Sequence, residues 1–429
     1  MMKSLRSYAM KPIVATCIAF AVCSGAHAAP DEEELGKSQG YPNMGNRSSI
    51  YAQKNAVGSI TSMDSLYKTN IVPKGSKPVR EFGTPAFTAP IKYQFKGEEK
   101  TLDNWIENNR ALATLVIKDN TMLVERYQYD RTSDMKFVGF SMSKTVVGFL
   151  VGAALKDGSI KSIDDTVGMY EKDLADSDYG KVTIRNLLRM NSGMKWYEMG
   201  RGDLDPSSDV KDLADSTYRQ YRSNGGVSFV KRLRANPDTL QGTVYNYSSA
   251  DTFVLGTVLR AATNKTLAAY TSEKIWQNIG AEADASWNAD YSGVEASFAY
   301  FNARPRDWAR MALWMADGAV KEGVITADYW NEMTATDAQP ARQKARSIFK
   351  YYGYGYQTWI MPYQTRTFAL VGSWGQMIVV QPATKTVFIK LMARKTQKED
   401  ITTFQEDTYL VHGILKEVAK NAAQIPMPN

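Results

Sequence analysis

The chain of 429 residues carries 52 basic and 45 acidic residues, a formal net charge of +7, with its basic positions scattered along the sequence. Scattered basic residues indicate an ordinary surface, so nucleic acid is not expected as a partner. The two cysteines and two histidines are too few for a thiolate or histidine metal site, and no metal or other cofactor is expected.

The first 28 residues have the pattern of a secretory signal peptide. Lys3, Arg6 and Lys11 precede an apolar run over residues 13–22, and an Ala-x-Ala triplet ends at Ala28. Cleavage after Ala28 predicts a periplasmic or secreted mature protein, which has lost three cations and keeps a charge of +4. No later stretch is apolar for the roughly 18 residues that a bilayer requires, so no membrane segment is expected after cleavage.

The mature chain is predicted to be a polar leader over residues 29–55 followed by one domain over residues 56–429. Both cysteines, Cys17 and Cys23, leave with the signal peptide, which excludes a cysteine nucleophile and a disulfide. The first clear pair of strands is expected at residues 111–130, where two apolar segments meet at Asp119-Asn120.

Residues 139–158, GFSMSKTVVGFLVGAALKDG, predict a buried helix that carries one cation, Lys144, near its start. Ser141 lies three residues earlier, so the two side chains share one helix face. Burial disfavours a charged lysine, and a neutral Lys144 is able to take a proton from Ser141. The N–H of Ser141 at the helix start is also suited to stabilise an oxyanion. A simple N-cap serine with a lysine that reaches solvent is the alternative for this motif alone.

A second helix is expected to begin after the N-cap Thr183 and to end at residues 191–193, Asn-Ser-Gly. The following residues, 197–226, are polar and rich in Asp, Ser, Tyr and Gly, and we interpret them as a loop or lid. Three tyrosines are candidates to close over a substrate from this lid: Tyr197, Tyr218 and Tyr221.

Helices and then strands are predicted in the remainder of the chain. Helices are expected at residues 250–262 and 303–317, the second with Pro305 in its first turn. Strands are expected at 352–360, 367–372, 376–380 and 386–393, followed by a helix at 404–421. This order predicts an α/β (α+β) fold, in which one antiparallel sheet is built from N- and C-terminal pieces, flanked by helices, with an all-helical insertion.

Tyr247 and Ser249, in the segment VYNYSSAD, form a second candidate motif at the junction before the 250–262 helix. A phenol at this place is able to relay a proton between the serine, the leaving group and Lys144. Ser249 is a candidate donor to the substrate or to Lys144. A packed aromatic residue followed by N-cap serines is the structural alternative, and an N-cap role is compatible with catalysis.

A third candidate motif is Gly375-Gln376, which lies between two strand-like segments in LVGSWGQMIVV. Glycine permits a close backbone approach, and the N–H of Gln376 is a candidate second oxyanion donor. Most glycine turns of this kind are structural. His412 is the one histidine left after signal cleavage, and no G-x-S-x-G segment supports a Ser-His-Asp triad.

In this order and spacing, the three motifs resemble those of the serine β-lactamase and penicillin-binding-protein superfamily. Together with VTIRNLLRMNSGM and ARPRDWARMALWMADG, they are most similar to the class C β-lactamase-related hydrolases of the 6-aminohexanoate-dimer hydrolase (nylon oligomer) and carboxylesterase branch. The resemblance implies a β-lactamase/transpeptidase-like fold and an acyl-enzyme formed on Ser141. It implies Lys144 and Tyr247 as general base and acid, the N–H groups of Ser141 and Gln376 as the oxyanion hole, and Ser249 in the place of the family's Asn.

The sequence departs from the superfamily at Ser373-Trp374-Gly375, which stands where β-lactamases have Lys-Thr-Gly. The missing lysine would bind a substrate carboxylate, a contact worth about 1.5 to 3 kcal/mol. Trp374 offers an apolar wall instead. We therefore expect a small linear amide or ester as substrate. A β-lactamase or D-peptidase acting on β-lactams or peptidoglycan peptides, and a non-catalytic penicillin-binding-like sensor, remain alternatives, and the sequence leaves the oligomeric state open.

Overall fold

The computed structural model describes residues 29–43, 52–85, 90–198, 208–219, 225–334, 353–395 and 401–419. The predicted signal peptide at residues 1–28 lies outside these ranges. Within them, no helix has both the length and the apolar composition needed to cross a membrane.

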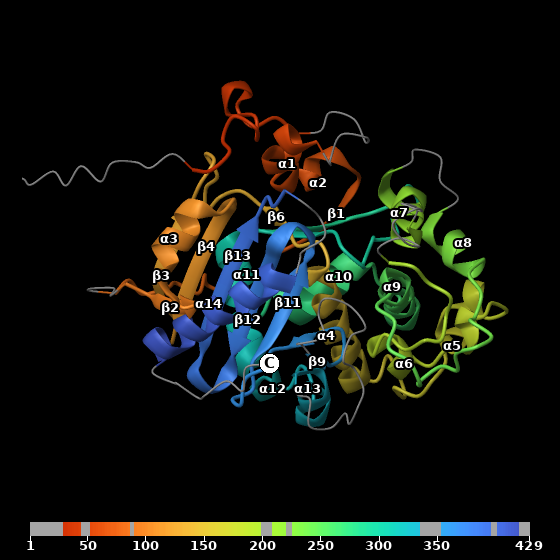
Figure 1. Ribbon diagram of the computed structural model, residues 1–429. Coiled ribbons are helices and arrows are strands. Elements are labelled where there is room, and N and C mark those ends of the chain that lie inside the picture. Colours follow the sequence, from red (N-terminus) through yellow and green to blue (C-terminus); the bar gives the residue numbers. More distant parts are fainter. Residues whose placement is uncertain are drawn as a thin grey trace, which may run out of the picture.

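A seven-stranded antiparallel sheet forms the centre of the molecule, in the order β5-β4-β13-β12-β11-β10-β9 (Figure 1). The N-terminal hairpin pairs with the C-terminal strands through β4 and β13, with Val116 opposite Phe388. This pairing confirms the predicted sheet of N- and C-terminal pieces. Its strands are β4 (Ala111–Lys118), β5 (Thr121–Tyr127), β9 (Gly353–Tyr354), β10 (Trp359–Ile360), β11 (Phe368–Gly372), β12 (Gln376–Gln381) and β13 (Thr386–Met392).

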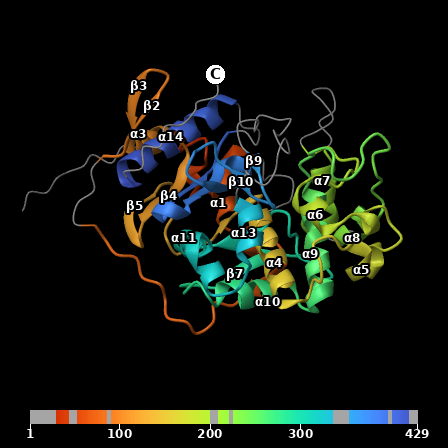
Figure 2. The same ribbon diagram turned by 90° about the horizontal axis from the view of Figure 1, so that it is seen from below.

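Both faces of this sheet are covered, which explains why its central strands are apolar at consecutive positions. Met377 and Val379 of β12 belong to one core cluster, and Ile378 and Val380 belong to the other. The first face packs against α3 (Leu102–Asn108) and α14 (Ile401–Ala419), with the hairpin β2 (Lys92–Phe95) and β3 (Glu98–Thr101) beside them (Figure 2). The second face packs against α4 (Met142–Asp157) and α11 (Pro305–Leu313).

The helical insertion lies to one side of the sheet and holds most of residues 167–263 (Figure 1). Its helices are α5 (Val167–Tyr170), α6 (Ile184–Leu188), α7 (Asp209–Ala214), α8 (Gly225–Lys231) and α9 (Ser249–Thr263). A smaller sheet has the order β1-β7-β8-β6, from β1 (Thr69–Val72), β6 (Phe137–Val138), β7 (Ala285–Asn288) and β8 (Phe301–Ala303). The remaining helices are α1 (Gln53–Ile60), α2 (Met63–Leu66), α10 (Leu267–Thr271), α12 (Ala319–Lys321) and α13 (Ala327–Thr334).

Most of the predicted elements are confirmed within a few residues. The Thr183 hydroxyl caps α6 by accepting from the backbone N–H of Asn186 at 3.3 Å, although the helix ends at Leu188, earlier than predicted. Pro305 occupies the first turn of α11, as predicted. The buried helix, the α9 helix and the three strands β11 to β13 lie where the sequence placed them.

Two segments differ from the prediction. The lid expected at residues 197–226 contains helix α7 and the start of α8, because Ser208 caps α7 and the helix buries Leu213. Of its tyrosines, Tyr221 and the side chain of Tyr218 lie outside the described residues, whereas Tyr197 is described and exposed. The single strand expected at residues 352–360 is a hairpin of β9 and β10, because Gln357 adopts a left-handed conformation between them (φ 55°).

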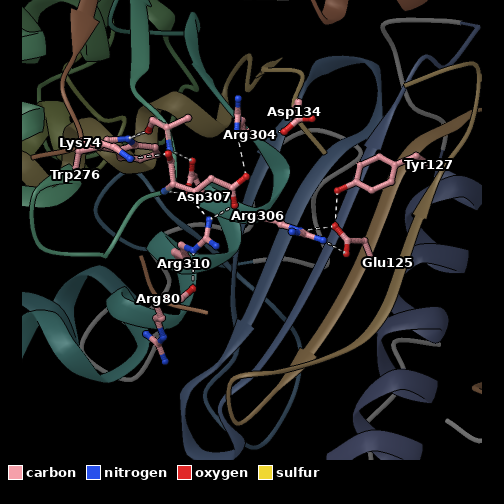
Figure 3. Close-up of polar contacts among 12 residues, drawn as sticks. Lys74, Arg80, Glu125, Tyr127, Asp134, Trp276, Arg304, Arg306, Asp307 and Arg310 are labelled. Carbon is pink, nitrogen blue, oxygen red and sulfur yellow. Dashed lines mark hydrogen bonds and ion pairs between the residues drawn. The ribbon is translucent and has the colours of Figure 1, made fainter. Parts of the chain in front are cut away.

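Helix α11 is tied to strand β5 by an arginine–carboxylate pair (Figure 3). Arg306 binds Glu125 of β5 through two contacts of 2.8 Å, and the Tyr127 hydroxyl donates to the same carboxylate at 2.7 Å. Burial raises the pKa of Glu125, but the hydrogen bonds from Arg306 and Tyr127 hold it below its ordinary value overall. Asp307 accepts from Arg310 at 2.7 Å within the same helix. The carboxylates of Glu125 and Asp307 are therefore paired with arginines that hold the fold together.

Candidate active site

Ser141 lies at the N-terminus of α4, directly after strand β6 and a strained turn. Phe140 has a φ of 44°, a conformation that is unfavourable for a residue with a Cβ, and its ring packs against Tyr300. The N–H of Gly139 donates to the carbonyl of Phe301 at 2.8 Å, which ties the turn to β8. The local structure thus holds Ser141, which is partly exposed, at the start of a buried helix.

Lys144 lies one turn later and is 1% exposed. Its Nζ is 3.0 Å from Ser141 Oγ, 3.0 Å from Ser249 Oγ and 2.8 Å from the carbonyl oxygen of Phe298. Burial lowers the pKa of Lys144 to about 8, against an opposing effect of the Glu198 carboxylate. The structure therefore brings Ser141, Lys144 and Ser249 together. The lowered pKa of Lys144 is in the range in which a lysine is able to act as a general base near neutral pH.

Tyr247 closes the cluster from the other side. The Nζ of Lys144 lies 5.1 Å from the centre of the Tyr247 ring. A hydrogen bond with Ser141 lowers the pKa of the Tyr247 phenol, against the larger effect of burial. The ring is stacked on Trp359 of β10 at 5.6 Å and meets Tyr354 of β9 edge-on. Burial raises the pKa of Tyr247 above its ordinary value, which keeps the phenol protonated at neutral pH.

The residues of the Tyr-Ser-Ser motif have different roles because α9 starts among them. Ser248 is the N-cap, and its hydroxyl accepts from the N–H of Asp251 at 3.2 Å. Tyr247 precedes the cap, and Ser249 begins the first turn. The helix start thus directs two of the three side chains toward Lys144 and uses the third for capping.

The end of β11 passes directly against the start of α4. A Cβ added to Gly372 would lie 2.3 Å from the carbonyl oxygen of Gly139 and 3.3 Å from the nitrogen of Ser141. The turn Ser373–Gly375 follows, with positive φ at Trp374 and at Gly375, and leads into Gln376. Glycine at position 372 is therefore what allows the strand and the helix to approach so closely.

The side chains of this turn have structural partners of their own. Trp374 is 7% exposed and packs in the core, which leaves little of its ring for a substrate. Gln376 faces Gly372 across the β11–β12 ladder. Its side chain bridges to the backbone of Met392, donating to the carbonyl at 2.7 Å and accepting from the N–H at 3.1 Å. The side-chain amide of Gln376 thus points toward β13. The side chain of Ser373 is partly exposed.

The sequence did not indicate Glu198, which lies beside Ser249. One carboxylate oxygen accepts from Ser249 Oγ at 2.5 Å, and the other accepts from the N–H of Ser249 at 2.9 Å and from the Trp196 indole at 2.6 Å. Glu198 belongs to a polar segment without periodicity, and its partner is 51 residues away. The one available signal was an acidic residue directly after an aromatic pair, Trp196-Tyr197, which is too common to carry a prediction.

A buried carboxyl group, Asp251, lies behind this cluster on α9. It accepts from the Tyr179 hydroxyl at 2.9 Å, and burial raises its pKa to about 7. His412 lies on α14, which packs on the opposite face of the sheet from α4. Among the described residues, no group of three or more His, Cys, Asp or Glu side chains is arranged to hold a metal ion.

The antiparallel sheet and the Ser-x-x-Lys helix beside it place the protein in the class of serine hydrolases that carry a lysine near the serine. The family described as Beta-lactamase matches residues 102–409, which is most of the chain. The chain belongs to the Beta-lactamase family and is a serine hydrolase of that superfamily.

Three of the similar proteins have names that describe hydrolases. The chain is 26% identical over 298 residues to the 6-aminohexanoate-dimer hydrolase of Paenarthrobacter ureafaciens, covering 68% of this chain and 74% of the relative. A solved structure from Bacillus anthracis, assigned as a 6-aminohexanoate-dimer hydrolase, superposes with a TM-score of 0.76 at 20% identity, covering 88% of this chain and 98% of that one. A family VIII carboxylesterase superposes with a TM-score of 0.54 at 16% identity, covering 72% and 93%.

Proposed function

We propose that the protein hydrolyses a small linear amide or ester through an acyl-enzyme formed on Ser141, with Lys144 and Tyr247 as its proton-transfer groups. The observation that carries this proposal is the 3.0 Å separation between the buried Lys144 Nζ and the Oγ of Ser141, which is partly exposed. Burial leaves a large fraction of the lysine neutral near pH 8, and a neutral amine accepts the serine proton.

The reaction begins when Lys144 takes the proton of Ser141 and the serine oxygen attacks the substrate carbonyl. Tyr247 donates a proton to the leaving amine or alcohol and recovers one from Lys144. The C–N or C–O bond breaks and leaves the acyl group on Ser141. Water then adds to the acyl-enzyme and loses a proton to the same groups. They return a proton to Ser141 Oγ as its bond to the acyl carbon breaks, and the acid is released.

The N–H of Ser141 provides one donor to the oxyanion, and the turn after β11 provides the second. Sequence resemblance assigned this role to the N–H of Gln376. A Cβ built on Gly372 would lie 3.3 Å from the Ser141 nitrogen. Because Ser373 directly follows Gly372, this proximity favours the N–H of Ser373 instead. Both assignments use the same turn, and both place backbone donors at the carbonyl oxygen.

The substrate class follows from the charge and shape of the surroundings. On either assignment the lysine that would bind a carboxylate is absent: Ser373 stands in its place if Gly375 is the motif's glycine, and Leu370 does if Gly372 is. A β-lactam carboxylate therefore gains little at this position. Trp359 and Tyr354 are almost fully buried and support the ring of Tyr247, which is partly exposed and is suited to contact an alkyl chain. The relatives named 6-aminohexanoate-dimer hydrolase and carboxylesterase support a linear amide or ester.

Export is part of the proposal, and it rests on the signal-peptide pattern of residues 1–28. Cell fractionation together with N-terminal sequencing tests it, with Ala29 as the expected first residue of the mature protein. A cytoplasmic protein that retains residues 1–28 would contradict export.

A substrate screen of the purified mature protein tests the activity. It compares short-chain p-nitrophenyl esters, linear amide dimers, peptides ending in D-amino acids, and the chromogenic cephalosporin nitrocefin. The proposal expects the highest kcat/KM for an ester or linear amide. A higher value for nitrocefin or a D-peptide than for every ester and amide would support the β-lactamase or D-peptidase alternative, and no turnover with any of them would support the sensor.

A further inference from the structure

The Lys144 amine has three hydrogen-bond partners, and they differ in what each is able to do. The carbonyl oxygen of Phe298 only accepts. Ser249 Oγ has a single proton, which it donates to the Glu198 carboxylate at 2.5 Å, so toward Lys144 it only accepts. Ser141 Oγ is the third partner, and it has a proton to give.

A neutral amine has two N–H groups and one lone pair. Phe298 and Ser249 both require a donor, so they take the two N–H groups of Lys144. The lone pair is left for the direction of Ser141, which is where it must be to accept the proton of the nucleophile. This assignment depends on Glu198, because a Ser249 hydroxyl without an acceptor would be free to donate to the Lys144 nitrogen.

We propose that Glu198 is a positioning residue: by accepting the Ser249 proton, it turns Ser249 into an acceptor for Lys144 and so directs the lysine lone pair to Ser141. This inference rests on the proposed roles of Ser141 and Lys144. Glu198 is itself held in place, since its second oxygen accepts from the Ser249 N–H and from the Trp196 indole. The carboxylate therefore acts through Ser249 without touching the nucleophile.

The variant Glu198→Gln keeps the shape of the side chain and changes one acceptor into a donor. Two N–H groups face the oxygen that accepts from Trp196 and from the Ser249 backbone, so the amide NH2 is excluded from that place and faces Ser249 Oγ instead. The NH2 then donates to the hydroxyl, and the Ser249 proton turns toward Lys144, where it competes for the lone pair. We expect kcat/KM for the best ester to fall by about tenfold or more at its plateau.

The variant has a second signature in the pH profile. The acidic limb of kcat/KM reports the group that must be neutral, here Lys144, and the Glu198 carboxylate raises the pKa of that lysine. The tyrosines that interact with Glu198 have raised pKa values, which keeps them neutral: Tyr179, Tyr245, Tyr247 and Tyr354. Asp251 lies behind Ser248, and its pKa of about 7 is set mainly by burial, with a smaller upward effect of Glu198. Loss of the carboxylate charge therefore lowers the pKa of Lys144, and the limb moves to lower pH.

The experiment measures ester hydrolysis as a function of pH for the mature wild type, Glu198→Gln, Ser249→Ala and the double variant, with melting temperatures to confirm folding. Glu322→Gln is the control, because it removes an exposed carboxylate whose ion pair is with Lys77. The proposal expects the double variant to match the rate of Ser249→Ala, because Glu198 acts through that hydroxyl, while the acidic limb still moves to lower pH. Glu198→Asp, which retains the acceptor, is expected to recover part of the rate.

Three results would overturn the inference: a wild-type rate and acidic limb in Glu198→Gln, rate losses that add in the double variant, or a loss of rate with no downward movement of the limb. Ser141→Ala separates this from the proposed function. An inactive Ser141→Ala beside a fully active Glu198→Gln would remove only the role of Glu198. An active Ser141→Ala would remove the nucleophile and both proposals with it.

Discussion

Lys144 is the residue in which burial and chemistry are most directly linked. The same enclosure that lowers its pKa to about 8 also fixes its amine on three oxygen atoms. Helix geometry placed Ser141 beside it from sequence alone, because residues three apart share a face. Glu198 was missed for the opposite reason: its contact with Ser249 depends on how a loop folds back, and a loop leaves no periodic signal.

Removing either proton-transfer group is expected to lower kcat strongly. Lys144→Ala and Tyr247→Phe should each reduce kcat by about a hundredfold or more, the usual scale for a positioned general acid or base. His412→Gln is the matched comparison and should leave kcat nearly unchanged, because His412 lies on α14 on the other face of the sheet. Steady-state hydrolysis of the best ester measures all three. A large loss in His412→Gln would indicate a histidine triad instead.

At the scale of elements, the site depends on how closely β11 approaches the start of α4. The sequence predicted both elements, since the apolar run of α4 and the strand pattern of β11 are local signals. It did not predict their contact, which rests on the absence of a Cβ at Gly372. The helices α7 and α8 inside the expected lid were also missed, because they are too short to show a clear apolar periodicity.

The variant Gly372→Ala tests this contact. The new Cβ would lie 2.3 Å from the Gly139 carbonyl oxygen, so β11 and the turn that precedes Ser141 must move apart. We expect kcat/KM to fall by about tenfold or more, because the oxyanion donors lose their geometry. Gly83→Ala is the control, since its Cβ would meet only ordinary contacts at 3.6 Å. Wild-type kinetics and melting temperature in Gly372→Ala would show that the close approach is dispensable.

At the scale of the whole molecule, the chain encloses the site between a sheet and a helical insertion. The seven-stranded sheet joins residues from both ends of the chain, and α9 brings the Tyr-Ser-Ser motif to α4 from the other side. The element order predicted this architecture because terminal strands separated by helices have few other ways to share a core. The substrate is harder to predict from the sequence than the fold is. The sequence suggested Trp374 as an apolar wall for the substrate, but this side chain is mostly buried.

The substrate preference is tested by placing a cation in the turn after β11. Ser373→Lys should raise kcat/KM for nitrocefin relative to the best ester, because the new ammonium is able to pair with the β-lactam carboxylate. Position 373 is partly exposed and so has room for the longer side chain. Parallel kinetics with both substrates measure the ratio. An unchanged or lower ratio would mean that position 373 does not govern carboxylate recognition.

The central claim, that Ser141 is a nucleophile activated by Lys144, is tested most directly by covalent labelling. The mature protein is treated with a fluorophosphonate over a range of pH, and the adduct is located by mass spectrometry of its peptides. Labelling is expected on Ser141, with a rate that rises as pH passes through about 8, since Lys144 becomes neutral above its pKa. Lys144→Ala should label far more slowly. An adduct on a different serine, or a rate of Ser141 labelling that is the same in Lys144→Ala, would contradict the claim.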